Sequence, residues 1–329
     1  MVISQTPLRI SFLGGGTDFK DFYMVHGGGV VSAAIDKYIF VIVKERFDDK
    51  IYINYSEKEI VSSVENVRHE LVREAMKMTG VTSGVEITTL ADIPSEGSGL
   101  GSSSSLTVGL LNALYTHAGE PKAPEILAQQ ACEIEIDILG KPIGVQDQYI
   151  AAYGNLRKFD FNKDGTVTNR KMTLTGAQFR DLGENLMLFF TNRTRKSESI
   201  LTEQKDKIRI NVPTLCQMTG LAVKAENCLN CGDLYRLGEL MNEGWRLKKS
   251  LASKIADAEI DNLYESALSA GALGGKIAGA GGGGFLLVYC PLERRAELRE
   301  KLSQLREFAF NLEYDGTKII FNYRRSTLK

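Results

Sequence analysis

Side chains that bind transition metals are scarce in this sequence, which has three histidines and five cysteines among 329 residues. The histidines, His26, His69 and His117, match no metal-ligand spacing, so we expect surface or packed side chains. Only Cys228 and Cys231 form a C-x-x-C pair, and a structural zinc site would need a second pair that the sequence lacks. We therefore expect a helix end or a turn there, without zinc or redox function. Few and scattered thiols indicate a reducing compartment, and we expect the cytoplasm.

Long apolar runs and a net charge are also missing. No apolar run reaches the roughly 20 residues that span a bilayer, and no basic region followed by an apolar stretch opens the sequence, so we expect neither a membrane span nor a secretory signal. The 40 basic and 41 acidic residues leave a formal charge of −1. Because binders of nucleic acid or anionic membranes normally carry a marked basic excess, we expect no nucleic acid and no membrane among the partners.

Glycine, by contrast, is abundant and clustered. The glycines gather at residues 14–16, 27–29, 97–101 and 279–284. Clusters of this kind mark places where the backbone turns tightly or approaches a ligand closely. We expect the binding site to be built around them.

Between the glycine clusters the sequence has the strand and helix patterns of an α/β (α+β) fold. Runs of Val, Ile and aromatic residues predict strands, and apolar residues at helical spacing predict helices. We expect strands at 8–13, 30–34, 38–43, 50–54, 85–90, 155–161, 167–174, 185–191, 284–289 and 318–323. We expect helices at 66–78, 102–117, 124–139, 199–205, 213–227, 233–252 and 260–270. Because the chain exceeds what one core usually supports, we expect two domains, 1–170 and 171–329.

The segment 94–105, PSEGSGLGSSSS, is the richest in chemistry. Its three glycines lie between a predicted strand and a predicted helix, and they let consecutive N–H groups turn towards one anion. The helix N-terminus adds unpaired donors and a partial positive charge, and the serines add hydroxyls for phosphate and a hard cation. A flexible linker is the alternative, but linkers rarely lie between a strand and a well-patterned helix. The segment matches neither a Walker A loop nor G-x-G-x-x-G, and no protein-kinase signature occurs.

A second segment, 133–149, carries several acidic side chains. Glu133 and Asp137 have the pattern of solvated charges on a helix. Glu135 lies among isoleucines, so its carboxylate needs a partner such as a metal ion. Asp147 follows a glycine-proline turn and precedes an apolar stretch, which suggests a partly buried carboxylate. Taken alone, such an aspartate is more often a helix cap than a catalytic base.

Two further segments combine strands with glycines or charges. In KIAGAGGGGF, residues 276–285, four glycines precede a strand, and since glycine weakens strands they imply close approach of the backbone to a ligand or another loop. In PLRISFLGGGTDF, residues 7–19, Arg9 is an unexpected charge inside a strand and Asp18 follows the glycine turn. The alternatives are a surface arginine on an edge strand and a cap or turn aspartate.

Taken in order, these segments resemble the motifs of the GHMP kinases, the family that includes galactokinase, homoserine kinase and mevalonate kinase. The family's proline-led G-L-G-S-S loop falls at 94–103, its first motif at 7–18 and its glycine-rich third motif at 276–284, so the resemblance covers essentially the whole chain. It implies an ATP-dependent kinase that uses Mg²⁺. It also implies an N-terminal and a C-terminal α/β domain with the active site in the cleft between them.

The resemblance implies a role for each matching residue. Asp147 falls on the catalytic base, and Arg9 on the basic residue that neutralises charge near the acceptor hydroxyl. Glu135 and Ser103 fall on the Mg²⁺ ligands. The residues that hold the ATP phosphates would be Pro94, Gly97, Ser98, Gly99, Leu100, Gly101, Ser102, Ser103 and Ser104. Those that hold the acceptor would be Gly15, Gly16, Thr17, Asp18, Gly281 and Gly282.

The first motif departs from galactokinase, because Gly15 and Gly16 replace a glutamate and a histidine that help hold galactose. The G-G-G-T-D version resembles the heptose 7-phosphate kinases of bacteria, as do Q-D-Q-Y and the T-N-x-T-R at 191–195. This implies phosphorylation of the anomeric C1 hydroxyl of D-glycero-D-manno-heptose 7-phosphate to the 1,7-bisphosphate, a step towards nucleotide-activated heptose for surface polysaccharide. Fucose kinases share the motif and are the alternative.

A phosphorylated acceptor needs a further cation for its distal phosphate. Arg193, Arg195 and Lys196 are candidates, because guanidinium forks suit phosphate oxygens, although a solvated charge run is an equally good interpretation. A catalytically inactive sugar or nucleotide sensor is a different class, disfavoured because the base and the metal ligands are present. An RNA-binding module would need a basic face. The expected partners are therefore ATP and a phosphorylated sugar, with monomer and homodimer both open.

Overall fold

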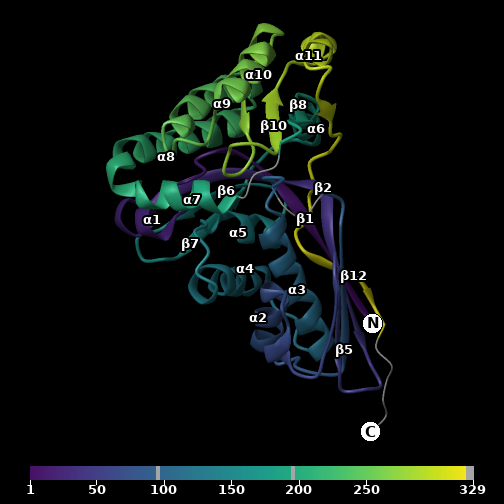
Figure 1. The fold of residues 1–329 in the computed structure, drawn as a ribbon. Coiled ribbons are helices and arrows are strands. Elements are labelled where there is room, and N and C mark those ends of the chain that lie inside the picture. The colour runs from purple at the N-terminus through teal and green to yellow at the C-terminus, as the bar shows by residue number, and fades with distance from the viewer. Residues whose placement is uncertain (94–96, 194–196, 324–329) are drawn as a thin grey trace.

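The structure, a computed structural model, describes residues 1–93, 97–193 and 197–323, and it contains two β-sheets, one above the other in Figure 1. The first sheet consists of β1 (Val2–Leu13), β2 (Gly28–Glu45), β3 (Ile51–Asn54), β4 (Lys58–Val61), β5 (Val85–Ala91), β6 (Leu156–Phe161), β7 (Val167–Lys171) and β12 (Lys318–Asn322). The helices of the first half of the chain are α1 (Lys20–His26), η1 (Val64–Asn66), α2 (Glu70–Thr79), α3 (Ser102–Ala118), α4 (Pro124–Cys132), η2 (Glu133–Ile138) and α5 (Gln146–Tyr153).

The second sheet and its helices come from the second half of the chain. Its strands, in spatial order, are β11 (Arg306–Glu307), β8 (Leu186–Phe190), β10 (Phe285–Tyr289) and β9 (Gly274–Ile277). The helices are α6 (Gly176–Glu184), α7 (Ser197–Asp206), α8 (Ile208–Cys231), α9 (Leu234–Lys249), α10 (Ala258–Ser269), η3 (Leu292–Arg294) and α11 (Arg295–Lys301).

Two long strands form the centre of the first sheet. β1 pairs antiparallel with β2 over almost its whole length, and side chains such as Leu8, Ile10 and Ile35 are fully buried. β2 pairs with β6 at its start and with β5 further on. The strands predicted at 30–34 and 38–43 are two parts of the single strand β2. The first part pairs with β6 and the second part pairs with β5.

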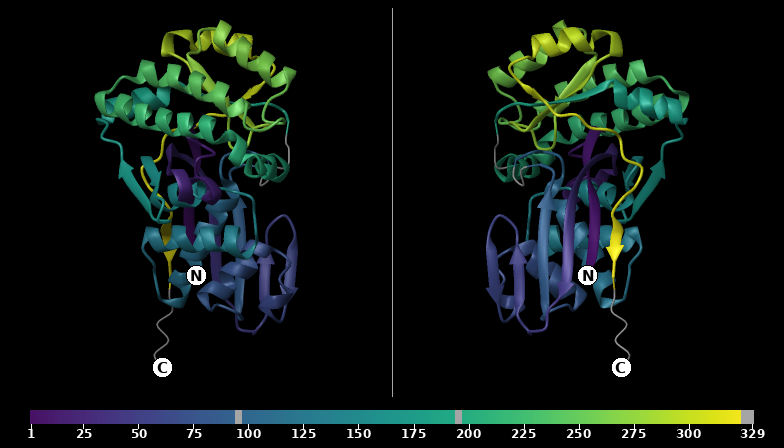
Figure 2. Two further views of the ribbon diagram at one scale, coloured as in Figure 1. Left: turned by 90° about the vertical axis from the view of Figure 1, so that its left-hand side faces the viewer. Right: turned by 90° about the vertical axis from the view of Figure 1, so that its right-hand side faces the viewer.

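Helices α2 to α5 lie on one face of this sheet, and the right-hand view of Figure 2 looks onto the opposite face. α3 packs on β1 and β2 as well as on α2, α4 and α5, so residues around most of its circumference are buried, Leu110, Leu111 and Leu114 completely. This packing fixes the start of α3 beside β1, where the backbone N–H of Arg9 donates to Leu100 O at 3.0 Å.

Helices of the second part of the chain reach the first sheet. α9 packs on β9, α8 packs on α9, and α8 also packs on β1 and β2. Trp245 in α9 is 1% exposed and belongs to the apolar core of this second part. The junction between the two parts therefore brings the start of the chain, at β1, against helices that follow it by some two hundred residues.

Three predicted elements need correction. The strand predicted at 318–323 is β12, which pairs with β1 in the first sheet and does not close the second one; the division near residue 170 stays a prediction. The helix predicted at 124–139 is α-helical only to Cys132 and continues as the π-helix η2. The helix predicted to begin at Pro213, a residue typical of helix starts, begins at Ile208 and contains the proline.

The sequence patterns also miss the short elements α1, α5, α6, α11, β4, β9 and β11. None of them exceeds nine residues, which is shorter than the window over which hydrophobic periodicity is informative. Cys228 and Cys231 lie at the end of α8 as predicted, and their thiols are free. Across the described ranges, no helix combines the length and the apolarity needed to cross a bilayer.

Candidate active site

Arg9 and Asp147 form the centre of the site. The side chain of Arg9 is 5% exposed, so the alternative of a surface arginine is wrong. Asp147 is the second residue of α5 and not the residue that caps it, and at this position the helix dipole favours a carboxylate. Arg9 Nε donates to Asp147 Oδ1 at 2.7 Å and Nη2 donates to Oδ2 at 2.6 Å. The structure therefore joins the two predicted catalytic side chains in one bidentate ion pair.

Arg9 also connects this pair to the predicted phosphate loop. Its Nη1 donates to Gly99 O at 2.5 Å, and its backbone N–H is held by Leu100 O. A Cβ at Gly101 would lie 3.1 Å from Arg9 Cγ and 3.4 Å from Asp147 Oδ2. The predicted base and the predicted phosphate loop are thus neighbours, with one arginine hydrogen-bonded to both.

The predicted loop leads directly into the N-terminus of α3. Gly97, Gly99 and Gly101 have φ of +74°, +73° and +79°, a conformation that L side chains rarely adopt and that lets a loop turn successive N–H groups to one side. The first N–H groups of an α-helix have no partner within the helix and attract anions. The other predicted loop residues that the structure describes here are Ser98, Leu100, Ser102, Ser103 and Ser104. Pro94 lies outside the described residues.

The glycine-rich segment of the second half contacts this loop backbone to backbone. A Cβ at Gly99 would lie 2.4 Å from Ala278 O, and a Cβ at Gly284 would lie 2.7 Å from Ser98 O. Of the two interpretations left open for the glycine run, close approach to another loop is therefore realised, and that loop is the predicted phosphate loop. Glycine is required on both sides because side chains would separate the two backbones.

Glu135 is the buried acid of its segment. It is 0% exposed within the π-helix η2, whereas Glu133 and Asp137 are exposed as predicted. Its carboxylate accepts hydrogen bonds from Ser103 Oγ and from Gln148 Nε2, both at 2.6 Å. Burial raises the pKa of Glu135, and these two hydrogen bonds oppose part of that rise.

This group of oxygens suits a hard divalent cation. Glu135 and Ser103 offer a carboxylate and a hydroxyl, and Gln148 Oε1 is buried without a hydrogen-bond partner among the described residues. Mg²⁺ prefers such ligands and binds through one or two carboxylates together with nucleotide phosphates. No cluster of three or more His, Cys, Asp or Glu in the described ranges could hold a metal, so an ion here would take its remaining ligands from phosphates and water.

The glycine turn after β1 fixes Asp18 against the start of α5. Asp18 is 3% exposed, and its carboxylate accepts from Gly16 N at 2.8 Å and from Gln146 N at 3.3 Å. A Cβ at Gly144 would lie 2.0 Å from Asp18 Oδ2, so only glycine allows this approach. Burial raises the pKa of Asp18, and the nearby Asp147 adds to the rise.

The predicted acceptor residues of this turn have different surroundings. Thr17 is fully buried, and its hydroxyl donates to Gly29 O at 3.1 Å and accepts from Gly29 N at 3.0 Å, so it holds the turn in place. Gly15 faces other parts of the molecule: a Cβ there would lie 3.5 Å from Gln146 Nε2 and 3.8 Å from Lys276 Nζ.

Two buried lysines of the second half, Lys248 and Lys276, face this turn. Lys248 lies in the last turn of α9 and is 4% exposed; Lys276 lies in β9 and is 7% exposed. A Cβ at Gly16 would lie 3.5 Å from Lys248 Nζ. Burial lowers the pKa of Lys248 to about 8 and that of Lys276 to about 7.

The predictions made from the sequence include neither lysine, and only Lys276 has a pattern that could have pointed to it. Lys248 belongs to a K-K-S run at a helix end, which has the pattern of a solvated charge. Lys276 does carry a signal, because a lysine directly before an apolar, glycine-rich motif is as unexpected as the arginine inside β1.

The cation cluster proposed for a distal phosphate has other partners where it is described. Arg193 donates to both carboxylate oxygens of Asp257, at 3.0 and 2.5 Å, and to Glu259 at 3.0 Å. Arg193, one of the candidates for binding a distal phosphate, therefore has two carboxylate partners. Arg195 and Lys196 lie outside the described residues.

Gly281 and Gly282, predicted to contact the acceptor, lie against Ile255. The backbone N–H of Gly282 donates to Ile255 O at 2.8 Å, and a Cβ at Gly281 would lie 2.8 Å from the Ile255 side chain. Their backbone is therefore engaged within the second part of the chain.

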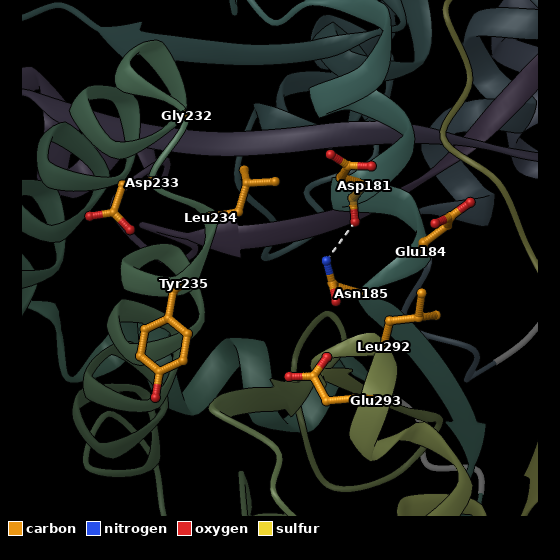
Figure 3. A pocket seen from close by; sticks show the side chains of 9 residues that line it. All are labelled: Asp181, Glu184, Asn185, Gly232, Asp233, Leu234, Tyr235, Leu292 and Glu293. Atoms are coloured by element: carbon orange, nitrogen blue, oxygen red, sulfur yellow. Dashed lines mark hydrogen bonds between the residues drawn. The ribbon is translucent and has the colours of Figure 1, made fainter.

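A hollow of about 450 Å³ lies elsewhere in the molecule, between α6, the start of α9 and η3 (Figure 3). Its lining includes four carboxylates and no cation: Asp181, Glu184, Asp233 and Glu293. Because phosphate-bearing ligands need positive charge or N–H donors, this hollow does not suit the chemistry of the glycine-rich loop.

Comparison with known proteins identifies the family to which the chain belongs. Two family profiles match the chain, "GHMP kinases N terminal domain" at residues 62–155 and "GHMP kinases C terminal" at residues 222–306. A D-glycero-alpha-D-manno-heptose 7-phosphate kinase of Campylobacter jejuni is 29% identical, covering 94% of this chain and 96% of that protein. A bifunctional fucokinase/GDP-fucose pyrophosphorylase of Arabidopsis thaliana is 25% identical over 92% of this chain and 31% of that protein.

A solved structure has the same fold. The crystal structure of a D-glycero-D-manno-heptose 1-phosphate kinase from Bacteroides thetaiotaomicron matches with a TM-score of 0.83 at 24% identity, covering 98% of this chain and all of that one. The mixed α/β fold expected from the sequence is thereby confirmed. The chain belongs to the GHMP kinase family of phosphotransferases.

Proposed function

We propose that this GHMP kinase transfers the γ-phosphoryl group of ATP to the anomeric hydroxyl of D-glycero-D-manno-heptose 7-phosphate, giving the 1,7-bisphosphate. One observation carries the proposal: Arg9 holds the Asp147 carboxylate bidentately and at the same time bonds to Gly99 of the phosphate loop. The choice of acceptor rests on the heptose 7-phosphate kinase that is 29% identical over nearly the whole length of both chains, and on the G-G-G-T-D turn.

In this mechanism Asp147 orients the acceptor hydroxyl. Each carboxylate oxygen accepts one hydrogen bond from Arg9 and has a second lone pair with which to accept the hydroxyl proton. Phosphoryl transfer depends mainly on positioning the reacting groups and on neutralising charge. Arg9 positions Asp147 relative to the loop, and its positive charge lies between them. The N–H groups of the loop and of the α3 N-terminus bind the nucleotide phosphates.

Glu135 and Ser103 would hold Mg²⁺, and Gln148, which donates to Glu135 through Nε2, has its Oε1 buried without a hydrogen-bond partner among the described residues. When bound, Mg²⁺ neutralises the charge that develops on the transferring phosphoryl oxygens. Ser103 lies in the first turn of α3, directly after the phosphate loop. The chain therefore has hard oxygen ligands next to the N–H groups that bind phosphate.

The acceptor is tested by a coupled ADP-release assay over heptose 7-phosphate, fucose, galactose and mannose, with ATP and Mg²⁺. We expect the highest kcat/KM with heptose 7-phosphate. The related fucokinase of Arabidopsis thaliana makes fucose the second candidate. Activity on unphosphorylated sugars alone would contradict the proposed acceptor, and binding of sugar and nucleotide without any ADP release would support an inactive sensor.

A further inference from the structure

The structure brings two positive charges of the second half to the Gly15–Gly16 turn of the first half. Lys248 and Lys276, here called the lysine pair, are each more than nine-tenths buried, and their ammonium groups lie next to the positions that side chains at Gly16 and Gly15 would occupy. Any larger residue in the turn would occupy space in front of these ammonium groups. Because glycine has no side chain, the backbone of the turn lies directly beside both ammonium groups.

The lysine pair differs from the other buried cations of the described residues in having no carboxylate partner. Arg9 pairs with Asp147, and Lys158 pairs with Asp160. Lys248 donates to two neutral oxygens, Gly15 O at 3.3 Å and Gln204 Oε1 at 2.7 Å. Lys276 forms neither a hydrogen bond nor an ion pair with any residue that the structure describes.

Two unpaired buried cations in one place favour an anion as their partner. A buried charge is costly without a counter-charge, and two like charges raise that cost. For Lys276, burial is the main cause of the lowered pKa, and the charges of Lys248 and Arg9 lower it further, while Asp18 and Asp147 offset only part of this decrease. A ligand with two negative charges, such as a phosphate monoester, would relieve all three effects.

Uncharged hydrogen-bonding groups lie beside the lysine pair without a partner of their own. Ser11 Oγ and Trp245 Nε1 are buried and make no hydrogen bond within the described residues. The Ser11 hydroxyl would lie 3.6 Å from a Cβ at Gly15, and Trp245 lines the same small cavity as both lysines. That cavity, which Gly14 and Gly15 of the turn also line, has a volume of about 10 Å³, with room for about one water molecule. A phosphate could therefore reach the lysine pair only if the turn and the lysine side chains moved apart.

We propose that the lysine pair binds the phosphate group that the acceptor sugar carries, an inference that rests on the function proposed above. The turn at Gly15 faces Gln146, next to Asp147, while the phosphate loop contacts the same ion pair through Gly99 and Gly101. The lysine pair thus belongs to the acceptor end of the site, with Asp18, and the nucleotide end is served by the loop. The lysine pair would thus bind the distal phosphate for which Arg193 was a candidate. Arg193 itself pairs with Asp257 and Glu259.

The test compares Lys248→Met and Lys276→Met with wild type, using heptose 7-phosphate and unphosphorylated heptose as acceptors. We expect each substitution to raise KM for heptose 7-phosphate about tenfold or more, as for loss of a charged hydrogen bond. The KM for ATP and the kcat/KM for unphosphorylated heptose should stay within about twofold. Lys249→Met is the matched control, since Lys249 is next to Lys248 in sequence and pairs with Asp261.

A measurement on the wild-type protein covers the case in which a variant does not fold. Inorganic phosphate should inhibit turnover competitively against heptose 7-phosphate and not against ATP. Inhibition that is competitive only against ATP, a raised KM for ATP in the folded variants, or equal losses with both heptoses would overturn the role of the lysine pair. If wild type phosphorylates heptose 7-phosphate while those results are found, the proposed function stands and only this inference fails. Wild-type activity confined to unphosphorylated sugars would overturn both.

Discussion

Arg9 and Asp147, 138 residues apart in sequence, meet through two parallel hydrogen bonds of 2.7 and 2.6 Å. The fork of the guanidinium fixes the plane of the carboxylate, which a single hydrogen bond would not do. Because the third donor of Arg9 reaches Gly99 O, the same side chain sets the position of the carboxylate relative to the phosphate loop. One buried arginine therefore sets the position of the proposed base relative to the proposed phosphate loop.

Asp147→Asn should abolish most of the turnover while ATP still binds. The amide keeps the shape of the side chain but cannot take up a proton and places an N–H group against Arg9. We expect kcat to fall about a hundredfold or more, with the dissociation constant for ATP unchanged, measured by single-turnover kinetics and nucleotide titration. Asp137→Asn is the control, because Asp137 is exposed and pairs with Lys20 at the surface. Near-normal turnover in Asp147→Asn would remove this residue from the mechanism.

Arg9→Lys should also lower kcat, although the positive charge is kept. An ammonium group cannot hold both oxygens of Asp147 and the carbonyl of Gly99 in one plane. We expect a loss of about ten- to a hundredfold in kcat, because small displacements of reacting groups have effects of that size. The thermal midpoint serves as a check on folding. If Arg9→Lys retained full activity, charge alone and not the fork geometry would explain the arginine.

Much of the fold and of the site follows from local patterns in the sequence. The phosphate loop has a signature within a dozen residues, and the isoleucines around Glu135 mark it as the buried acid of its helix. Asp147 and Arg9 carry weak signals when taken separately, since an aspartate near a helix start is usually a cap. Only the tertiary structure pairs them, and the family resemblance was the sole reason to assign them catalytic roles.

The parts that could not be predicted depend on long-range packing. β12 joins the first sheet because β1 has a free edge at Val2–Gln5, a fact about the folded sheet and not about residues 318–322. Lys248 has the sequence pattern of a solvated charge, and only the folded structure shows that it is buried. The surroundings of Arg193 are equally non-local, because its partners Asp257 and Glu259 lie more than sixty residues away.

Gly99→Ala should damage both nucleotide binding and stability. Its φ of +73° is strained for alanine, and the added Cβ would lie 2.4 Å from Ala278 O, forcing the two glycine-rich segments apart. Gly80→Ala separates these effects, because Gly80 has φ of +70° but no atom within 4 Å of the added Cβ. Gly80→Ala should cost about 1–2 kcal/mol of unfolding free energy and leave the KM for ATP unchanged. Gly99→Ala should cost more and raise the KM for ATP; equal effects of the two substitutions would contradict the contact.

The lysine pair should make the stability of the ligand-free protein depend on pH. In the folded protein the pKa values of Lys276 and Lys248 fall to about 7 and about 8, below the ordinary value of 10.5. Between about pH 7 and pH 10.5 the unfolded chain therefore binds more protons than the folded protein. The free energy of unfolding should rise with pH over that range. Around Lys276, the charges of Lys248 and Arg9 lower its pKa, while Asp18 and Asp147 raise it.

Replacing Lys276 by methionine should stabilise the ligand-free protein at low pH. At pH 6, where both ammonium groups are charged in the folded state, Lys276→Met should unfold at higher denaturant concentration than wild type in a phosphate-free buffer. This advantage should shrink as the pH is raised towards 9, because wild-type Lys276 then loses its buried charge at little cost. Lys249→Met should follow wild type at every pH, since Lys249 pairs with Asp261 at 2.7 Å. Parallel curves for wild type and Lys276→Met between pH 6 and 9 would mean that the Lys276 charge is already balanced in the ligand-free protein.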